Sequence, residues 1–444
     1  MTSNNTQPTV TSSIRVALWP LSSFGAMLWA GAACALLVAC ATPPAPPVEV
    51  AHAPAPLACP PAPKLNCPSL PAPAIPPVPP APPPDYRGRL APALWAELPD
   101  WGREALRPAL EAFVRGCPAL AKQDAWKAAC DGAQALSPTA PEHEIALFFE
   151  TGFDPWQVIN ADGTTTGMIT GYYEPLLHGS RTRTARYRYP IYGVPPDLLV
   201  IDLSAVYPEF KHRRLRGRLE GNRVVPYFAR SAIDGDPAPL KGLEIAWVDN
   251  PIDLFFLHIQ GSGQVELPNG ERLRVGYADQ NGHPFRSLGR LLIDTGEIRP
   301  EHASMKGIKD WARNNPRKVR EYLDANPSYV FFRELPRDLP GPLGSLGVPL
   351  TPERSLAVDP RVIPLGVPVY LATTWPDTSD PLERLMAAQD TGGAINGGVR
   401  ADFFWGFGDD AGAQAGKMRQ AGRMWVLYPK GFAPPPSAAQ AARP

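Results

Sequence analysis

Residues 389–406 read QDTGGAINGGVRADFFWG, a dense run of glycine and polar residues. An apolar segment ends in Asp390, a glycine turn follows, and Asp402 opens an aromatic segment. Two carboxylates at the ends of neighbouring strands can face one cleft, and glycines let a bulky ligand approach the backbone closely. A phosphate loop is the competing interpretation, but no Gly-Lys-Ser/Thr and no helix start follow. Carboxylate chemistry, which commonly cleaves glycosidic bonds, is therefore the leading interpretation.

Short strand-like segments separated by Gly and Pro lie on both sides of this stretch. We expect strands at 167–173, 223–228, 254–260, 272–277, 329–333, 355–359, 367–372, 384–390, 401–405 and 423–427. We expect helices from Leu98 through Phe113 and at 144–150, 286–294 and 304–314. This pattern favours β-barrels with flanking helices over a doubly wound sheet.

The amino-terminal region predicts export. Residues 16–39 are uncharged and small or apolar, which is typical of a secretory signal or of a spanning helix. The end of this run, Leu37-Val38-Ala39-Cys40, resembles a bacterial lipobox, in which Cys40 would be lipidated. Ala41 is not the aspartate that often marks inner-membrane retention, so the expected location is the periplasmic face of the outer membrane. A large share of the chain's 57 prolines lies just after Cys40. This proline-rich stretch predicts an extended linker.

Composition excludes several functional classes. The net charge is zero and the pI is about 7.0, so nothing indicates nucleic-acid binding. No Cys-x-x-Cys pair or His-Glu-x-x-His motif occurs, and no metal or organic cofactor is expected. His258 lies in an apolar run and is interpreted as packed or hydrogen-bonded rather than as a base. Cys117 and Cys130 are either two buried thiols or, in an exported chain, a disulfide.

Several motifs along the chain, in order, resemble the membrane-bound lytic murein transglycosylase A family with its carboxy-terminal three-aspartate domain. They are TGYYEP at 170–175, QGSG at 260–263, GYADQNGHPFRSLG at 276–289, AVDPRVIPLG at 357–366, DTGGAI at 390–395, DFFWG at 402–406 and AGKM at 415–418. The resemblance covers roughly residues 90–430. One departure is Asn396, where members often carry a basic residue, and it puts a local ligand contact in doubt.

The resemblance implies a mainly β fold in which a double-psi β-barrel carries an inserted second β domain. The expected division is a signal peptide at 1–39, a lipid anchor and linker at 40–87, the first part of the barrel with its helices at 88–174, the insert at 175–332, the second part of the barrel at 333–430, and a tail at 431–444. A glycan strand of peptidoglycan would bind between the barrel and the insert, and the lipid anchor would hold the chain to the membrane. Protein partners are unknown.

The resemblance also implies a mechanism with one acid. Asp402 would protonate the oxygen between N-acetylmuramic acid and N-acetylglucosamine, then act as base to form a 1,6-anhydromuramoyl end. Burial and the charge of Asp390 would raise the pKa of Asp402. Supporting aspartates would be Asp390 and Asp359, either of which could instead be a turn residue. The expected substrate contacts are Thr170, Tyr172, Gln260, Ser262, Gly392 and Gly393. An inverting hydrolase and a non-catalytic wall-binding lipoprotein are the alternatives.

Overall fold

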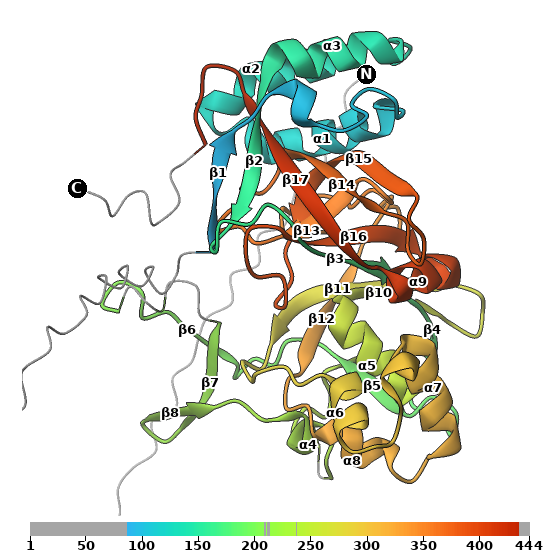
Figure 1. Ribbon diagram of the computed structural model, residues 1–444. Coiled ribbons are helices and arrows are strands. Elements are labelled where there is room, and N and C mark those ends of the chain that lie inside the picture. Colours follow the sequence, from blue (N-terminus) through green and yellow to red (C-terminus); the bar gives the residue numbers. More distant parts are fainter. Residues whose placement is uncertain (1–86, 208–209, 211–213, 237, 435–444) are drawn as a thin grey trace, which may run out of the picture. The chain divides into compact units, whose positions relative to one another are not determined.

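The computed structural model describes residues 87–434 except 208–209, 211–213 and 237 (Figure 1). The predicted signal peptide, the lipidation site Cys40 and the proline-rich linker up to residue 86 lie outside the described residues, as does the end of the tail. Chain contacts group the residues from Val78 onward as one compact unit.

An eight-stranded sheet takes its strands from both ends of the described chain, in the order β1-β2-β17-β14-β15-β13-β16-β3. Because β17 also pairs with β3, the strands from β17 through β14, β15, β13 and β16 to β3 form a closed ring (Figure 1). Its strands are β1 (Gly88–Pro92), β2 (Phe153–Asn160), β3 (Gly167–Glu174), β13 (Ser355–Val358), β14 (Pro368–Thr374), β15 (Pro381–Asp390), β16 (Arg400–Phe407) and β17 (Arg419–Pro429). The prediction of a mainly β fold with flanking helices is confirmed.

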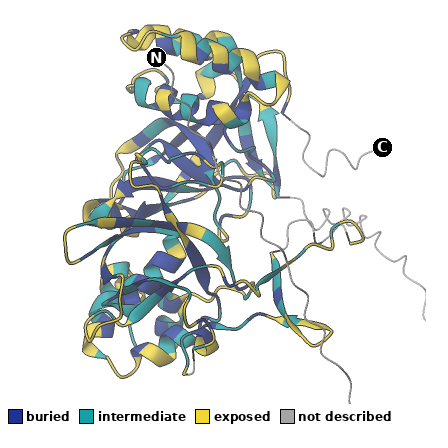
Figure 2. Cartoon of the chain, turned by 180° about the vertical axis from the view of Figure 1, so that it is seen from behind, coloured by how far each residue is buried: buried dark blue, intermediate teal, exposed yellow. Residues whose placement is uncertain are grey.

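Helices pack against the outside of this sheet. They are η1 (Trp95–Glu97), α1 (Arg107–Leu120), α2 (Asp124–Ala135), α3 (Glu142–Gly152) and α9 (Gly408–Lys417). Phe113 on α1, Trp126 on α2 and Phe149 on α3 are all buried and meet Phe153 at the start of β2. Figure 2 shows the same pattern, with buried residues on the strands and exposed residues on the outer faces of the helices. Apolar burial of this kind is the main stabilising contribution to such a layer.

Residues between β3 and β13 form a second body of structure with hydrophobic cores of their own. A six-stranded sheet has the order β12-β11-β10-β4-β9-β5, and a three-stranded sheet has the order β6-β7-β8. The strands are β4 (Leu176–Ser180), β5 (Tyr189–Tyr192), β6 (Leu199–Ile201), β7 (Leu215–Glu220), β8 (Arg223–Pro226), β9 (Glu244–Val248), β10 (Ser262–Glu266), β11 (Arg272–Gln280) and β12 (Val330–Leu335). The helices are α4 (Arg230–Ile233), α5 (Pro251–Gln260), α6 (Leu288–Asp294), η3 (Pro300–His302), α7 (Met305–Asn314) and α8 (Val319–Asp324). In the described part of the chain, no helix combines the length and apolarity needed to cross a membrane.

The chain passes from the ring into this second body at Glu174, whose carboxylate is only 1% exposed. Gln264 Nε2 donates a 3.0 Å hydrogen bond to Glu174, and Arg274 forms an ion pair with it. Arg274 also donates to the carbonyl of Leu339, where the chain returns toward the ring. One arginine therefore links the outgoing and the returning connection, and partners of this kind are what a buried carboxylate requires.

Two predictions about local structure were wrong. The first helix begins at Arg107 instead of near Leu98, because Asp100 and Gly102 adopt positive φ angles of 47° and 80° and form turns. Pro108 then occupies the first turn of α1, where a proline is tolerated.

The second wrong prediction is the strand at 254–260, which is the helix α5 and places His258 on a helix. The Asn250 side chain accepts hydrogen bonds from the N–H groups of Ile252 and Asp253, and Gly261 ends the helix at φ 78°. The capping residues were present in the sequence. An apolar run without a polar face, however, shows neither the helical nor the strand periodicity, so its secondary structure could not be assigned from the pattern. His258 is buried with Nδ1 3.0 Å from Arg230, and burial lowers its pKa, so its interpretation as a packed residue is confirmed.

Cys117 on α1 and Cys130 on α2 are joined by a disulfide with a Cα–Cα distance of 5.6 Å. We expect the double substitution Cys117→Ala and Cys130→Ala to lower the free energy of unfolding by about 3 kcal/mol, because it releases a short loop in the unfolded chain. Urea unfolding of the two proteins would measure this. The parent treated with a reductant should match the variant, and an unchanged midpoint in both would contradict the prediction.

Candidate active site

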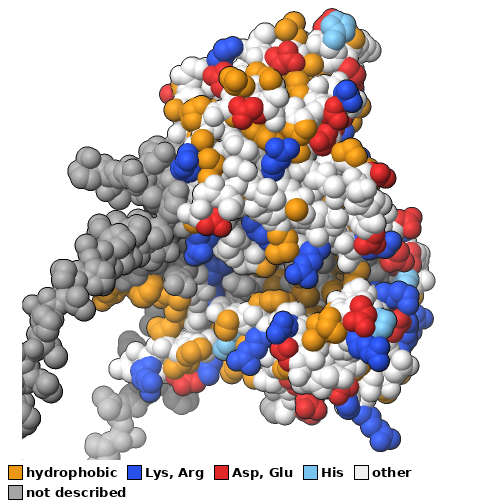
Figure 3. All heavy atoms as spheres, viewed as in Figure 1, with side chains coloured by type: hydrophobic (Ala, Val, Ile, Leu, Met, Phe, Trp, Pro, Cys, Tyr) orange, Lys and Arg blue, Asp and Glu red, His pale blue; other side chains and the backbone are white. Residues whose placement is uncertain are grey.

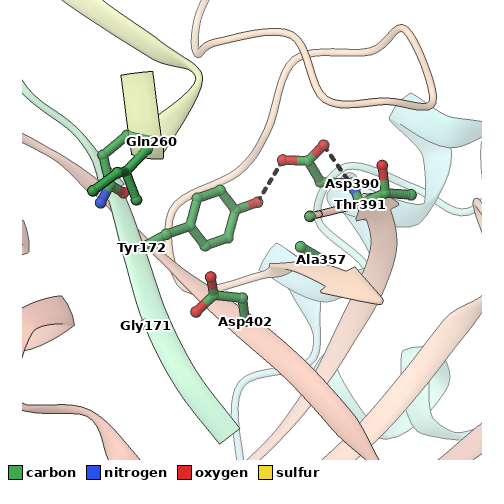
Figure 4. A pocket seen from close by; sticks show the side chains of 9 residues that line it. Gly171, Tyr172, Gln260, Ala357, Asp390, Thr391 and Asp402 are labelled. Carbon is green, nitrogen blue, oxygen red and sulfur yellow. Dashed lines mark hydrogen bonds between the residues drawn. The ribbon is translucent and has the colours of Figure 1, made fainter. Parts of the chain in front are cut away.

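A cavity of about 160 Å³ lies where the strand ring meets the carboxy-terminal end of α5. It is lined by Gly171, Tyr172, Ile259, Gln260, Ala357, Asp390, Thr391, Gly392 and Asp402. Figure 4 shows the Tyr172 side chain between the carboxyl groups of Asp390 and Asp402. In the space-filling view the surface is hollowed between the ring and the second body, with Lys and Arg side chains beside the hollow (Figure 3).

Strand register places Asp402 in this cavity. β16 lies between β3 and β13, and Asp402 is opposite Thr170 on one side and Ala357 on the other. Residues two apart on a strand share a face, so Phe404 lies beside Asp402 and meets Tyr172, with ring centroids 5.1 Å apart. Thr170 Oγ1 donates a 2.7 Å hydrogen bond to Asp402 Oδ1. None of the described residues donates to Oδ2.

The surroundings of Asp402 favour its protonated form. Burial raises the pKa of Asp402 to about 6, because desolvation penalises the charged carboxylate. The hydrogen bond from Thr170 and the charge of Arg400 act to lower this pKa, whereas the charge of Asp390 raises it. The direction and both predicted causes are confirmed. A carboxyl group with such a pKa can donate a proton near neutral pH and later accept one.

Asp390 ends β15 and is held by four donors. Oδ1 accepts hydrogen bonds from Ser345 N, Ser345 Oγ and Thr391 N, each at 2.9 Å, and Oδ2 accepts from the Tyr172 hydroxyl at 3.1 Å. Burial raises the pKa of Asp390, against the effect of these donors. The residue therefore caps the turn after β15 and also orients Tyr172. Its contacts fit both interpretations, as a turn residue and as a support for the site.

Asp359 lies just after β13 and does not line the cavity. Its carboxylate forms an ion pair with Arg361 and accepts a 2.8 Å hydrogen bond from Gly397 N, in the glycine turn between β15 and β16. Burial acts to raise the pKa of Asp359, but Arg361 and the backbone donors outweigh it and hold the pKa below its ordinary value. Asp359 can therefore support the site by fixing the turn that precedes Asp402.

The expected substrate contacts divide into two groups. Tyr172, Gln260 and Gly392 line the cavity, and Gln260 Oε1 is occupied by the 3.1 Å bond from Tyr173 N, so its amide nitrogen is the group left for a ligand. The other three residues do not line the cavity: Thr170, Ser262 and Gly393. The Thr170 hydroxyl bonds Asp402 instead, which makes it a positioning group.

Sequence reasoning missed Arg400 and four residues of the cavity lining, which are Gly171, Ile259, Ala357 and Thr391. Arg400 bonds the Thr170 hydroxyl at 3.0 Å and acts on the Asp402 pKa by its charge. Its position two residues before Asp402 would have placed it on the same strand face. Gly171 was also missed: a Cβ there would lie 2.6 Å from Trp405 Nε1, so only glycine allows β3 to approach β16 and α9 this closely. That requirement depends on packing and leaves no signal in a single sequence.

Among the described residues, no group of three or more His, Cys, Asp or Glu side chains could hold a metal ion. The geometry is that of a cleft lined by one available carboxyl group, the ring of Tyr172 and the amide of Gln260.

Comparison with known proteins identifies the family. Residues 168–333 match the family described as the MltA specific insert domain, and residues 354–428 match the 3D domain. Over 283 residues the chain is 34% identical to membrane-bound lytic murein transglycosylase A of Escherichia coli (strain K12), spanning 62% of this chain and 69% of that protein. The chain belongs to the membrane-bound lytic murein transglycosylase A family. It is an enzyme, a peptidoglycan lytic transglycosylase, so the non-catalytic alternative is not supported.

Solved structures of lytic murein transglycosylase A proteins share this fold. The chain matches MltA from Neisseria gonorrhoeae with a TM-score of 0.68 and 39% identity, covering 82% of this chain and 98% of that one. It matches E. coli MltA with bound chitohexaose with a TM-score of 0.56 and 28% identity, covering 77% and 91% of the two chains. The family name also supports membrane association for this member.

The hydrogen bond from the Thr170 hydroxyl stabilises the ionised form of Asp402 more than the protonated form. Removing that hydroxyl should therefore favour protonated Asp402. We expect Thr170→Val to raise the pKa of Asp402 above its value of about 6 by about one pH unit. Carbon-13 NMR titration of the aspartate carboxyl groups would measure the shift. Thr170→Ser keeps the hydroxyl and should leave the titration midpoint near that of the parent; a midpoint that falls in the valine variant would contradict the assignment.

Proposed function

We propose that this transglycosylase cleaves the β-1,4 bond between N-acetylmuramic acid and N-acetylglucosamine without water, leaving 1,6-anhydromuramoyl ends, and that it serves cell-wall turnover. The proposal rests chiefly on Asp402, because burial raises its pKa to about 6 and one of its oxygens faces the cavity without a donor from the described residues. One group with these properties can serve both proton transfers in turn.

In the first step the Asp402 carboxyl group protonates the bridging oxygen, and the bond from that oxygen to C1 of the muramoyl sugar breaks. In the second step the Asp402 carboxylate removes the proton from the C6 hydroxyl of the same sugar, and that oxygen bonds to C1. The carboxyl group ends as it began, and no water is consumed. Ionised Asp402 also places a negative charge near the electron-poor C1 between the two steps, which stabilises that stage.

An inverting hydrolase would need a second carboxylate to activate water. Neither candidate is suited to that role. Asp390 already accepts four hydrogen bonds, and Asp359 is ion-paired with Arg361 with a lowered pKa. A carboxylate whose lone pairs are occupied is a poor base, so both residues are proposed as supports for Asp402.

The substrate-binding residues are proposed on the cavity lining. Tyr172 offers a ring wall, Gln260 offers its amide nitrogen, and Gly392 allows a sugar to approach the backbone. E. coli MltA has been solved with bound chitohexaose, which is consistent with a cleft that accepts a glycan strand. Thr170 is proposed to hold Asp402 in position, and Ser262 and Gly393 remain candidates for contacts beyond the cavity.

Asp402→Asn is expected to lower the rate at which sacculi are solubilised by about 10²- to 10⁴-fold, because it removes the general acid. Mass spectrometry of the products from the parent enzyme should show anhydromuramoyl ends, each lighter by one water than a reducing end. Circular dichroism would establish that the variant is folded.

The matched control is Asp410→Asn on α9, which removes an exposed carboxylate and should keep the parent rate. Two outcomes would contradict the proposal. A folded Asp402→Asn variant could retain the parent rate, or the parent could release reducing ends, which would indicate the hydrolase.

We also propose that the closed ring is a double-psi β-barrel, built from 88–174 and 333–430, and that 175–332 forms the inserted domain. The separate hydrophobic clusters of the two regions support this division. The resemblance of residues 37–40 to a lipobox supports a lipid anchor at Cys40 and an outer-membrane location facing the periplasm.

Cys40→Ala is expected to move the protein from the membrane fraction to the soluble fraction, because one lipidated cysteine supplies the acyl chains of the anchor. Fractionation with and without radiolabelled palmitate would measure location and acylation. Cys59→Ala, in the same proline-rich region, is the control and should stay in the membrane fraction. A labelled, membrane-bound Cys40→Ala protein would contradict the assignment.

A further inference from the structure

Tyr277 lies beside the active-site cavity but outside its lining. It is on β11, is 38% exposed, and is not part of any hydrophobic cluster of the described residues. β10 and β11 pair with Ser262 opposite Gly276, which brings Tyr277 to the end of α5. A Cβ built on Gly261 would lie 3.8 Å from Tyr277 Cβ. Tyr277 is therefore next to Gly261, the residue that follows Ile259 and Gln260, which line the cavity on this side.

The pairing of β11 with β12 is irregular at Tyr277. Tyr277 pairs with Phe332, and the register of β11 and β12 shifts between Tyr277 and Asp279. Bulges of this type often re-aim a side chain next to an active site. An exposed tyrosine offers a flat apolar surface with a polar edge, which suits a sugar ring that has an apolar face and a rim of hydroxyls.

Burial raises the pKa of Tyr277, and the charge of Arg214 acts to lower it, so Arg214 lies close to the Tyr277 hydroxyl. Arg214 is exposed and forms no ion pair with any described residue, whereas its neighbour Arg216 is paired with Asp279 at 2.9 Å. The Arg216 pair anchors β7 to the end of β11 and thereby holds Arg214 near Tyr277. A guanidinium group with an open side is well suited to bind a carboxylate.

We propose that Tyr277 and Arg214 form a carboxylate-reading subsite at the edge of the glycan cleft, on the side of α5. Tyr277 stacks on a sugar, and Arg214 binds an acidic group attached to it. This inference rests on the proposed function, because peptidoglycan carries carboxylates on the stem peptide, or on the lactyl group of N-acetylmuramic acid once the peptide has been removed, whereas N-acetylglucosamine is neutral. Its consequence is specificity: the enzyme distinguishes muramoyl-containing strands from uncharged oligosaccharides.

The test uses the full-length enzyme and three ligands: peptide-bearing glycan strands, strands stripped of peptide so that the lactyl carboxylate is free, and the neutral hexamer of N-acetylglucosamine. Arg214→Gln should raise KM for peptide-bearing strands about fivefold with little change in kcat, the size expected for one partly exposed ion pair. The Kd of the neutral hexamer, measured by calorimetry, should not change. Tyr277→Ala should weaken binding of all three ligands.

The matched control is Arg223→Gln on β8, which removes one exposed positive charge from the same three-stranded sheet. It should leave every constant at the parent value. If KM rises only for the peptide-bearing strands, the stem peptide is the ligand of Arg214; if KM rises for the stripped strands as well, Arg214 also binds the lactyl carboxylate that removal of the peptide exposes. Equal effects of Arg214→Gln and Arg223→Gln, or an equal loss of hexamer binding in Arg214→Gln, would overturn the proposal.

These results are independent of the acid assignment. Reducing ends released by the parent enzyme would contradict the proposed anhydro product. The comparison of KM and Kd values would still be valid, because it does not depend on how the bond is cut.

Discussion

The parallel pairing of β3 with β16 is the contact on which the active site depends. It joins Thr170 and Asp402, which are 232 residues apart in sequence, and it helps to close the strand ring. Gly171 makes the pairing compatible with Trp405, because any side chain at that position would collide with the indole. The same pairing partly buries Asp402 and supplies the one hydrogen-bond donor to its carboxyl group among the described residues. Closure of the ring and the raised pKa of Asp402 therefore have a common structural origin.

The three aspartates of the barrel show how one residue type acquires different roles. Asp359 faces a guanidinium and is held ionised, whereas Asp390 is surrounded by neutral donors. Asp402 has a single hydroxyl donor and a desolvated setting, so its pKa rises to about 6. The difference comes from the number and charge of the donors, which decides how well each site tolerates the negative charge. Two carboxylates fix the turns around the cleft, and the third is left for chemistry.

The second body of structure completes the cleft from the opposite side. The Glu174–Arg274 pair ties the outgoing connection to the returning one at Leu339, so the attachment of this body to the ring is defined by buried contacts. Helix α5 ends at the cavity, where Gln260 bonds the backbone of Tyr173 on β3. That bond ties the Gln260 amide, which is proposed to contact the glycan, to the strand that carries Thr170 and Tyr172. The acid and the groups proposed to hold its substrate are thus connected through a single strand.

The sequence alone determined the mainly β class, most strands of the ring, the family and the three aspartates, because strand alternation and glycine turns are local patterns and the family motifs are contiguous. It misread α5, since an apolar run without a clear polar face does not reveal its period. It placed the first helix too early because Pro99, Asp100 and Gly102, which are typical turn residues, were read as part of the helix. Only the tertiary structure decided that Thr170 bonds Asp402, that Arg400 acts on the same carboxyl group, and that Asp359 lies outside the cavity. The physical reason is that hydrogen bonding and desolvation depend on distances between strands far apart in sequence, which no local pattern encodes.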